Sequence, residues 1–136
     1  MPGRVFQKAA ARILPSWDIS LFLTTPKEAQ SLNRALRNKT YIPNVLSYAV
    51  GEKNGEVILC PSEAKKQAHT FSLAPDDFLL LLFIHGLLHL KGMRHGTTME
   101  RLERKLLARV SDTYPHGTTH SNRNRHRHIS GKSSRR

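Results

Sequence analysis

Cysteine is nearly absent from this sequence of 136 residues, which contains only Cys60. A single cysteine excludes an internal disulfide framework and a zinc site built from several thiolates. Hydrophobic residues are also modest in number, at 38% of the chain. The length and composition therefore allow one small core and leave part of the chain outside it. We expect a single domain in a reducing compartment.

No apolar stretch is long enough for a membrane helix. The longest, Phe78 to Leu90, has 13 positions and includes two histidines, whereas a spanning helix needs about 20 apolar residues. The N-terminal segment, MPGRVFQKAAARILPSW, lacks the long apolar centre of a signal peptide. We therefore expect a cytoplasmic protein with no membrane partner.

Acidic residues are scarce, with 10 Asp and Glu against 22 Lys and Arg, a net charge of +12. Residues 114–136 hold six of the basic residues, four histidines and no acid, which leaves +6 on residues 1–113. This segment has no hydrophobic periodicity, so we predict a folded domain over residues 1–113 and a basic, His-rich, disordered tail over residues 114–136. The charge favours a polyanionic partner, with nucleic acid ahead of a membrane surface.

Hydrophobic periodicity predicts alternating helices and strands. We expect helices over 4–13, 26–37, 62–69 and 98–110, and a further helix that follows Pro75 and runs through Phe78 to Leu90. We expect strands over 17–24, 45–50 and 56–60. The helix over 75–90 is apolar on nearly all sides, which places it at the centre of the fold.

Turn and capping residues predict how these elements begin and connect. Thr24 or Thr25 caps the helix that starts at Pro26. The Asn54-Gly55 pair predicts the turn of an antiparallel hairpin.

The last helix has its own start signal and inward face. Thr97 and Glu100 have the spacing of a capping box. The apolar residues predicted to face inward are Met99, Leu102, Leu106 and Val110.

The stretch HGLLHLKGMRH, residues 85–95, carries the chemistry. His85 and His89 are four residues apart, so both imidazoles leave the same face of a helix. Gly92 can take the left-handed conformation that ends a helix and let the chain bring His95 back toward them. Three neutral imidazoles suit a divalent cation such as zinc, with a fourth position open to water. The spacing is that of the metzincin zinc site.

This stretch allows two other interpretations, ordinary core histidines and a zinc peptidase. Histidines on an apolar face are often ordinary core residues, but burying two imidazoles without partners costs a few kcal/mol, which a shared metal removes. A zinc peptidase of this spacing places a Glu general base directly after the first His, where this chain has Gly86. The stretch therefore favours a metal site but not a peptidase, and the positive charge points to phosphate substrates.

Three blocks of sequence resemble the YbeY family of metal-dependent endoribonucleases and ribosomal RNA maturation factors. Residues 85–95 match the family signature H-G-x-L-H-L-x-G-Y-D-H at all but two defined positions, where Met93 replaces Tyr and Arg94 replaces Asp. The segments 32–37, with Asn33 and Arg37, and 44–48 are similar to L-N-x3-R and to T-[DN]-V-L-S-F. Residues 55–61 are similar to the strand G-D-[IV]-x-I-[CS].

The resemblance implies an α+β fold: a single small domain with one mixed β-sheet packed by helices around a central metal-binding helix. It implies one zinc ion per chain on His85, His89 and His95, with His85 and Arg37 as the catalytic residues. The implied activity is single-strand-specific cleavage of RNA in maturation of the 16S ribosomal RNA 3′ end and in ribosome quality control. The implied partners are ribosomal RNA and the small subunit, with no DNA.

The departures from the signature keep two other functions open. One is a noncatalytic, ribosome-associated RNA-binding factor with a structural metal site, favoured by Arg94 and by the missing general base. The other is a metal hydrolase acting on a small molecule or peptide, which the charge of +12 counts against.

Overall fold

Three strands, β1 (Asp18–Leu23), β2 (Val45–Gly51) and β3 (Asn54–Leu59), form one mixed sheet in the order β1–β3–β2. β1 runs parallel to β3, and β2 pairs with β3 as an antiparallel hairpin. Val57 stands in the middle of this register, opposite Leu21 on one side and Ser47 on the other. The predicted hairpin and the predicted mixed sheet are therefore both confirmed.

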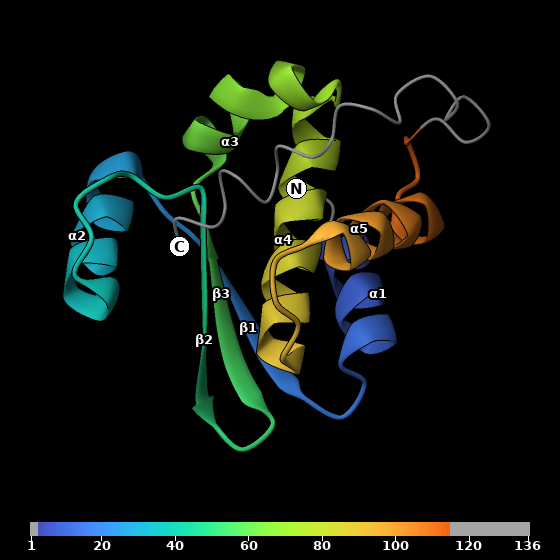
Figure 1. Ribbon diagram of the computed structural model, residues 1–136, viewed down its shortest axis with the longest axis horizontal. Coiled ribbons are helices and arrows are strands. Elements are labelled where there is room, and N and C mark those ends of the chain that lie inside the picture. Colours follow the sequence, from blue (N-terminus) through green and yellow to red (C-terminus); the bar gives the residue numbers. More distant parts are fainter. Residues whose placement is uncertain (1–2, 115–136) are drawn as a thin grey trace.

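Helices lie on both sides of the sheet in the computed structural model, which describes residues 3–114 (Figure 1). The helices are α1 (Gly3–Ile13), α2 (Pro26–Arg37), α3 (Pro61–Gln67), the 3-10 turn η1 (Ala68–Phe71), α4 (Pro75–Lys91) and α5 (Thr97–Val110). α2 lies on one face of the sheet, and α1, α4 and α5 lie on the other. The fold is α+β, as the sequence predicted.

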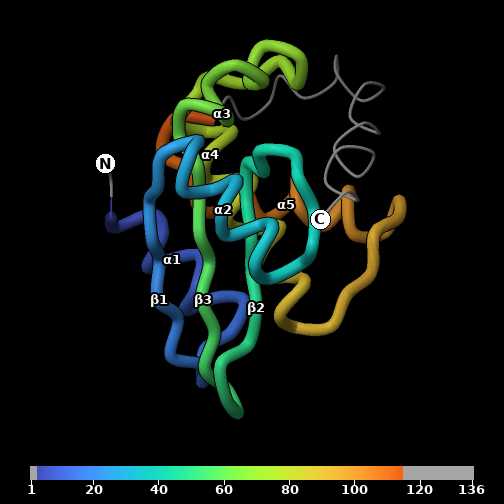
Figure 2. The backbone as a smooth tube through the Cα atoms, turned by 90° about the vertical axis from the view of Figure 1, so that its left-hand side faces the viewer, coloured from blue at the N-terminus to red at the C-terminus, as the bar shows by residue number. Residues whose placement is uncertain are grey.

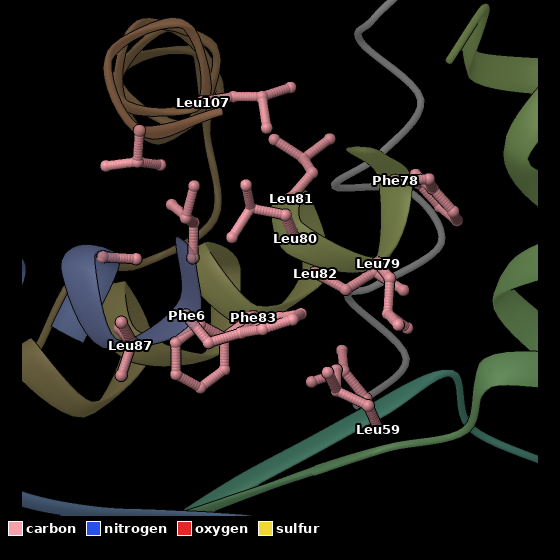
Figure 3. Close-up of a cluster of buried hydrophobic side chains, with 14 of the residues drawn as sticks. Phe6, Leu59, Phe78, Leu79, Leu80, Leu81, Leu82, Phe83, Leu87 and Leu107 are labelled. Atoms are coloured by element: carbon pink, nitrogen blue, oxygen red, sulfur yellow. The ribbon is translucent and has the colours of Figure 1, made fainter. Parts of the chain in front are cut away.

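α4 is the centre of the fold, because every residue from Asp77 to Leu88 is buried. Its apolar side chains contact β3 on one side and α1 and α5 on the others; Figure 3 shows Leu59 and Leu107 facing this helix. Phe83 packs edge-to-face on Phe6 of α1, with ring centroids 5.1 Å apart. Surrounded in this way, α4 needs no polar face, which explains its uniform hydrophobicity.

The helices of the described residues were compared with the length and composition of a membrane span. Within residues 3–114, no single helix combines the length and the apolar composition needed to cross a membrane. The helical segments 61–71 and 75–91 pass that test only as a pair, which is bent by 103°.

The hairpin turn lies two residues earlier than predicted. Asn54 and Gly55 belong to β3, and the chain reverses at Glu52 and Lys53, with Lys53 at φ 54°. Gly55 has another role, because a Cβ added there would lie 2.8 Å from a methyl carbon of Leu90. The glycine that suggested a turn is therefore needed for the close approach of β3 to α4.

The N-terminus of α5 also differs from the prediction. Its N-cap is Gly96, and no side chain caps the first turn, so the predicted capping box at Thr97 and Glu100 is wrong. The buried face differs as well, since its residues are Met99, Glu103, Leu107 and Val110. Leu102 and Leu106 are only half-buried at its margin.

The predicted tail lies almost entirely outside the described residues. Tyr114, its first residue, is buried in the core. Ser111, just before it, donates a hydrogen bond of 2.7 Å to the buried carboxylate of Asp77, which also accepts one from Thr113. Residues 111–114 are thus attached to the N-terminal end of α4.

Candidate metal centre

Three histidine side chains converge at the C-terminal end of α4. One ring nitrogen from each of His85, His89 and His95 lies within 4.8 Å of the other two. The Nε2 atoms of His85 and His89 are 3.1 Å apart. The centroid of the His95 ring lies 4.4 Å from that of His89 and 5.3 Å from that of His85. The structure therefore brings together the three residues that the sequence proposed as ligands.

Local geometry explains this convergence. His85 and His89 are one helical turn apart on α4. The helix then ends at Gly92, whose φ of 107° is left-handed and whose N–H bonds to the carbonyl of His89 at 2.9 Å. The chain turns back after Gly92, and this places His95 against the first two rings. In Figure 2 the loop after α4 lies beyond the β2 edge of the sheet.

In two of the rings, the nitrogen that points away from the cluster, Nδ1, contacts an oxygen atom. His89 Nδ1 lies 3.1 Å from the carbonyl oxygen of Met93. His85 Nδ1 is hydrogen-bonded to the carboxylate of Glu103 on α5. Because these oxygens accept, both Nδ1 atoms donate, and in the neutral rings both Nε2 atoms carry lone pairs. The two Nε2 lone pairs therefore face each other.

This arrangement fits a divalent cation. A shared proton would satisfy two facing nitrogens, whereas a cation satisfies all three rings. Tetrahedral zinc with Zn–N distances of about 2.0–2.1 Å requires ligand nitrogens about 3.3 Å apart. The 3.1 Å between the Nε2 atoms of His85 and His89 is close to that separation. His85 is buried and His89 and His95 are half-buried, so the centre is open on one side.

A side chain on the residue after the first histidine would be crowded by the sheet. A Cβ on Gly86 would lie 3.2 Å from Val57 Cγ1 and 3.3 Å from Ser47 Cβ, because α4 packs directly on β2 and β3 at this point. A glutamate there would have to enter this contact. The sequence therefore lacks the peptidase general base, and the helix–sheet packing disfavours any side chain at this position.

Arg37 is not part of the histidine cluster. It is half-buried in the last turn of α2, on the opposite face of the sheet from α4 (Figure 1). Its Nη1 donates a hydrogen bond of 3.1 Å to the hydroxyl of Tyr41. Arg37 and the histidines thus come from elements on different sides of the sheet.

Glu103 is the residue at this centre whose role the sequence analysis missed. The prediction for this helix did not include it, but its side chain is buried against His85. The signal was its spacing, four residues from both Met99 and Leu107, which puts it on the buried face of α5. The predicted inward face contained Leu102 and Leu106 instead of Glu103 and Leu107, so the prediction left Glu103 out.

A second polar pair lies on the other face of the sheet. The hydroxyl of Tyr48 donates a hydrogen bond to the carboxylate of Glu56, across the β2–β3 pairing. This hydrogen bond, with a smaller contribution from burial, raises the pKa of Tyr48 to about 12. Side chains alternate along a strand, so Ser47 faces α4 and Tyr48 faces away from it.

Comparison with known proteins gives consistent matches. A family model described as endoribonuclease YbeY matches residues 4–111. Endoribonuclease YbeY of Nautilia profundicola is 40% identical over 89 residues, 62% of this chain and 64% of that protein. Its counterpart in Thiobacillus denitrificans is 31% identical over 117 residues, 79% of this chain and 80% of that protein. The one in Neisseria meningitidis serogroup B is 38% identical over 89 residues, 57% and 53% of the two chains.

One solved structure shares the fold. The solution structure of TM1509 from Thermotoga maritima superposes with a TM-score of 0.60 at 22% identity, over 80% of this chain and 83% of that one. The matches to the three relatives above span from about half to four-fifths of those proteins' lengths.

Proposed function

Because the chain belongs to the YbeY endoribonuclease family, we propose that it hydrolyses phosphodiester bonds of single-stranded RNA with one zinc ion held by His85, His89 and His95. The observation that supports this most directly is the convergence of three ring nitrogens with the outer nitrogens of two rings anchored on oxygens. When bound, the cation supplies a Lewis acid for a phosphate oxygen and lowers the pKa of a water ligand.

Each proposed catalytic residue has a task that its position allows. His85 is buried and held from behind by Glu103, so its Nε2 keeps a fixed direction. Arg37 would bind a phosphate of the same RNA strand with its guanidinium and stabilise charge in the transition state. Since Arg37 and the histidines lie on opposite faces of the sheet, the substrate would pass around the β2 edge between them.

Positive charge supports RNA as the partner. In the exposed face of α1, Arg4, Lys8 and Arg12 follow one another at four-residue spacing, and α1 contains no acid. The tail over residues 114–136 adds six basic residues and no acid, and we assign it to nonspecific phosphate contacts. The proposed setting is the cytoplasm, where the chain would process the 16S ribosomal RNA 3′ end on the small subunit and act in ribosome quality control.

A noncatalytic RNA-binding factor with a structural metal is the second candidate. Gly86, which leaves no space for a general base, favours it. A structural zinc site is normally closed by four protein ligands, whereas the histidine group found within residues 3–114 has three. The open fourth position favours the enzyme.

Cleavage of one RNA in two forms tests the proposal. The zinc-loaded full chain should cut the single strand and spare the same sequence in a duplex. His89→Ala should lose both the cleavage and the zinc, since His89 supplies one of the three nitrogens. Tight RNA binding without cleavage by the zinc-loaded wild type would favour the noncatalytic factor.

A further inference from the structure

We propose that Glu103 is a positioning residue of the metal centre, which orients His85 so that Nε2 faces the cation. This inference rests on the metal site of the proposed function and adds a residue from outside the histidine motif. The side chains of His85 and Glu103 are each 1% exposed, and their hydrogen bond joins α4 to α5. Both side chains are thus shielded from bulk solvent.

The contact fixes which nitrogen of His85 is the ligand. An ionised carboxylate only accepts hydrogen bonds, so Nδ1 of His85 carries the hydrogen that binds Glu103. The other nitrogen, Nε2, then keeps its lone pair, and it lies 3.1 Å from Nε2 of His89. The hydrogen bond from Nδ1 to the buried carboxylate of Glu103 therefore also directs Nε2 of His85 toward the metal position.

The two anchored rings are not held equally. His89 binds the neutral carbonyl of Met93 through Nδ1 at 3.1 Å. His85 binds a charged acceptor, which makes a stronger hydrogen bond and raises the basicity of the opposite nitrogen. Of the two anchors, Glu103 is the one we expect to contribute more to metal affinity.

Core packing holds the carboxylate in place. Met99 and Leu107, one turn before and after Glu103 on α5, are 1% and 0% exposed. A carboxylate in such a position costs stability relative to an apolar residue of similar volume. Its presence on an otherwise apolar face therefore indicates a task other than packing.

Position 94 supplies no carboxylate to the histidines in this chain. The family signature that residues 85–95 resemble has an Asp directly before the third histidine, where a carboxylate could orient a ligand ring. Here that position is the exposed Arg94. The carboxylate behind a ligand histidine comes instead from α5.

Zinc affinity, measured by competition with a coloured chelator in the full chain, tests this role without any RNA. Glu103→Gln keeps the volume and removes the charge, and it should weaken zinc binding about 10–100-fold. Asp77→Asn is the matched control, because it also neutralises a buried carboxylate that contacts α5's C-terminal end. It should lower thermal stability and change the zinc affinity by less than about twofold. Zinc bound by the tail histidines is measured in His89→Ala and subtracted.

A second measurement needs no variant at position 103. Nitrogen-15 NMR of the zinc-loaded wild type should show His85 coordinated through Nε2 with a hydrogen on Nδ1. Coordination through Nδ1, or wild-type zinc affinity in Glu103→Gln, would overturn the role of Glu103 and leave the proposed function standing. A wild type that binds no more zinc than His89→Ala would overturn the metal centre, and with it both proposals.

Discussion

Gly86→Ala is the smallest change that tests how closely α4 packs on the sheet. In an unconstrained helix this substitution stabilises by about 1 kcal/mol, because alanine has the higher helix propensity. Here the new Cβ would lie 3.2 Å from Val57 Cγ1 and 3.3 Å from Ser47 Cβ. Overpacking of this kind costs about 1–3 kcal/mol. We therefore expect a net loss of about 1 kcal/mol in the free energy of unfolding, or about 4 °C in Tm.

A double-mutant cycle separates this contact from general effects. Val57→Ala removes the methyl group that the new Cβ meets, so the cost of Gly86→Ala should be smaller in that background, with a coupling of at least about 0.5 kcal/mol. Leu107→Ala, equally buried but on α5, is the matched control and should show no coupling. The assay is urea unfolding followed by circular dichroism, with zinc affinity measured on the same variants.

The packing of α4 on the sheet should also affect zinc binding. His85 and His89 flank Gly86 on the same helix, so lifting α4 from the sheet should weaken zinc binding together with stability. A Gly86→Ala chain that is about 1 kcal/mol more stable than the wild type, with unchanged zinc affinity, would refute the packing argument.

Four further predictions concern other parts of the chain. Arg37→Ala should abolish RNA cleavage and leave the zinc content unchanged, as measured by metal analysis and a cleavage assay; loss of zinc would contradict the assignment. Tyr48, whose pKa is about 12 when folded against about 10 in an unfolded chain, should contribute fully to stability below pH 10 and lose this contribution as the pH rises toward 12. Tyr48→Phe should therefore flatten the alkaline decline of the unfolding free energy, and an unchanged decline would argue against the Glu56 hydrogen bond. Asp77→Ala should lower the free energy of unfolding by about 1–3 kcal/mol, because it removes the oxygen to which Ser111 and Thr113 both donate; a shift of Tm below 1 °C would be too small for that network. Deleting residues 115–136 should weaken RNA binding most at low salt, since six basic residues are removed, and an unchanged salt slope would exclude the tail from binding.

Much of the fold could be predicted because its signals are local. The Pro26 start of α2, with Thr25 as its cap, and the apolar stripe of α1 were all visible in the sequence. Three details were predicted wrongly. Gly55 is required by Leu90 rather than by a turn, and the N-cap of α5 is Gly96, without a side-chain cap. The buried face of α5 contains Glu103 and Leu107 in place of Leu102 and Leu106.

The sequence by itself determined the histidine centre. Helix geometry places His85 and His89 on one face whatever surrounds them, and Gly92 provides the left-handed residue that turns His95 back. The family resemblance rests on the order and spacing of these residues, and both can be read from the sequence without a structure.

Only the tertiary structure decided what surrounds that centre. Glu103 reaches His85 because α5 packs on α4 with the face that carries Met99, Glu103 and Leu107. The spacing of these residues allows that face, but packing against α4 selects it. The exclusion of a side chain at Gly86 depends on the approach of β2 and β3. The separation of Arg37 from the histidines depends on which face of the sheet α2 covers. Each is a contact between segments distant in sequence, so its geometry is set by packing rather than by the period of a helix or strand.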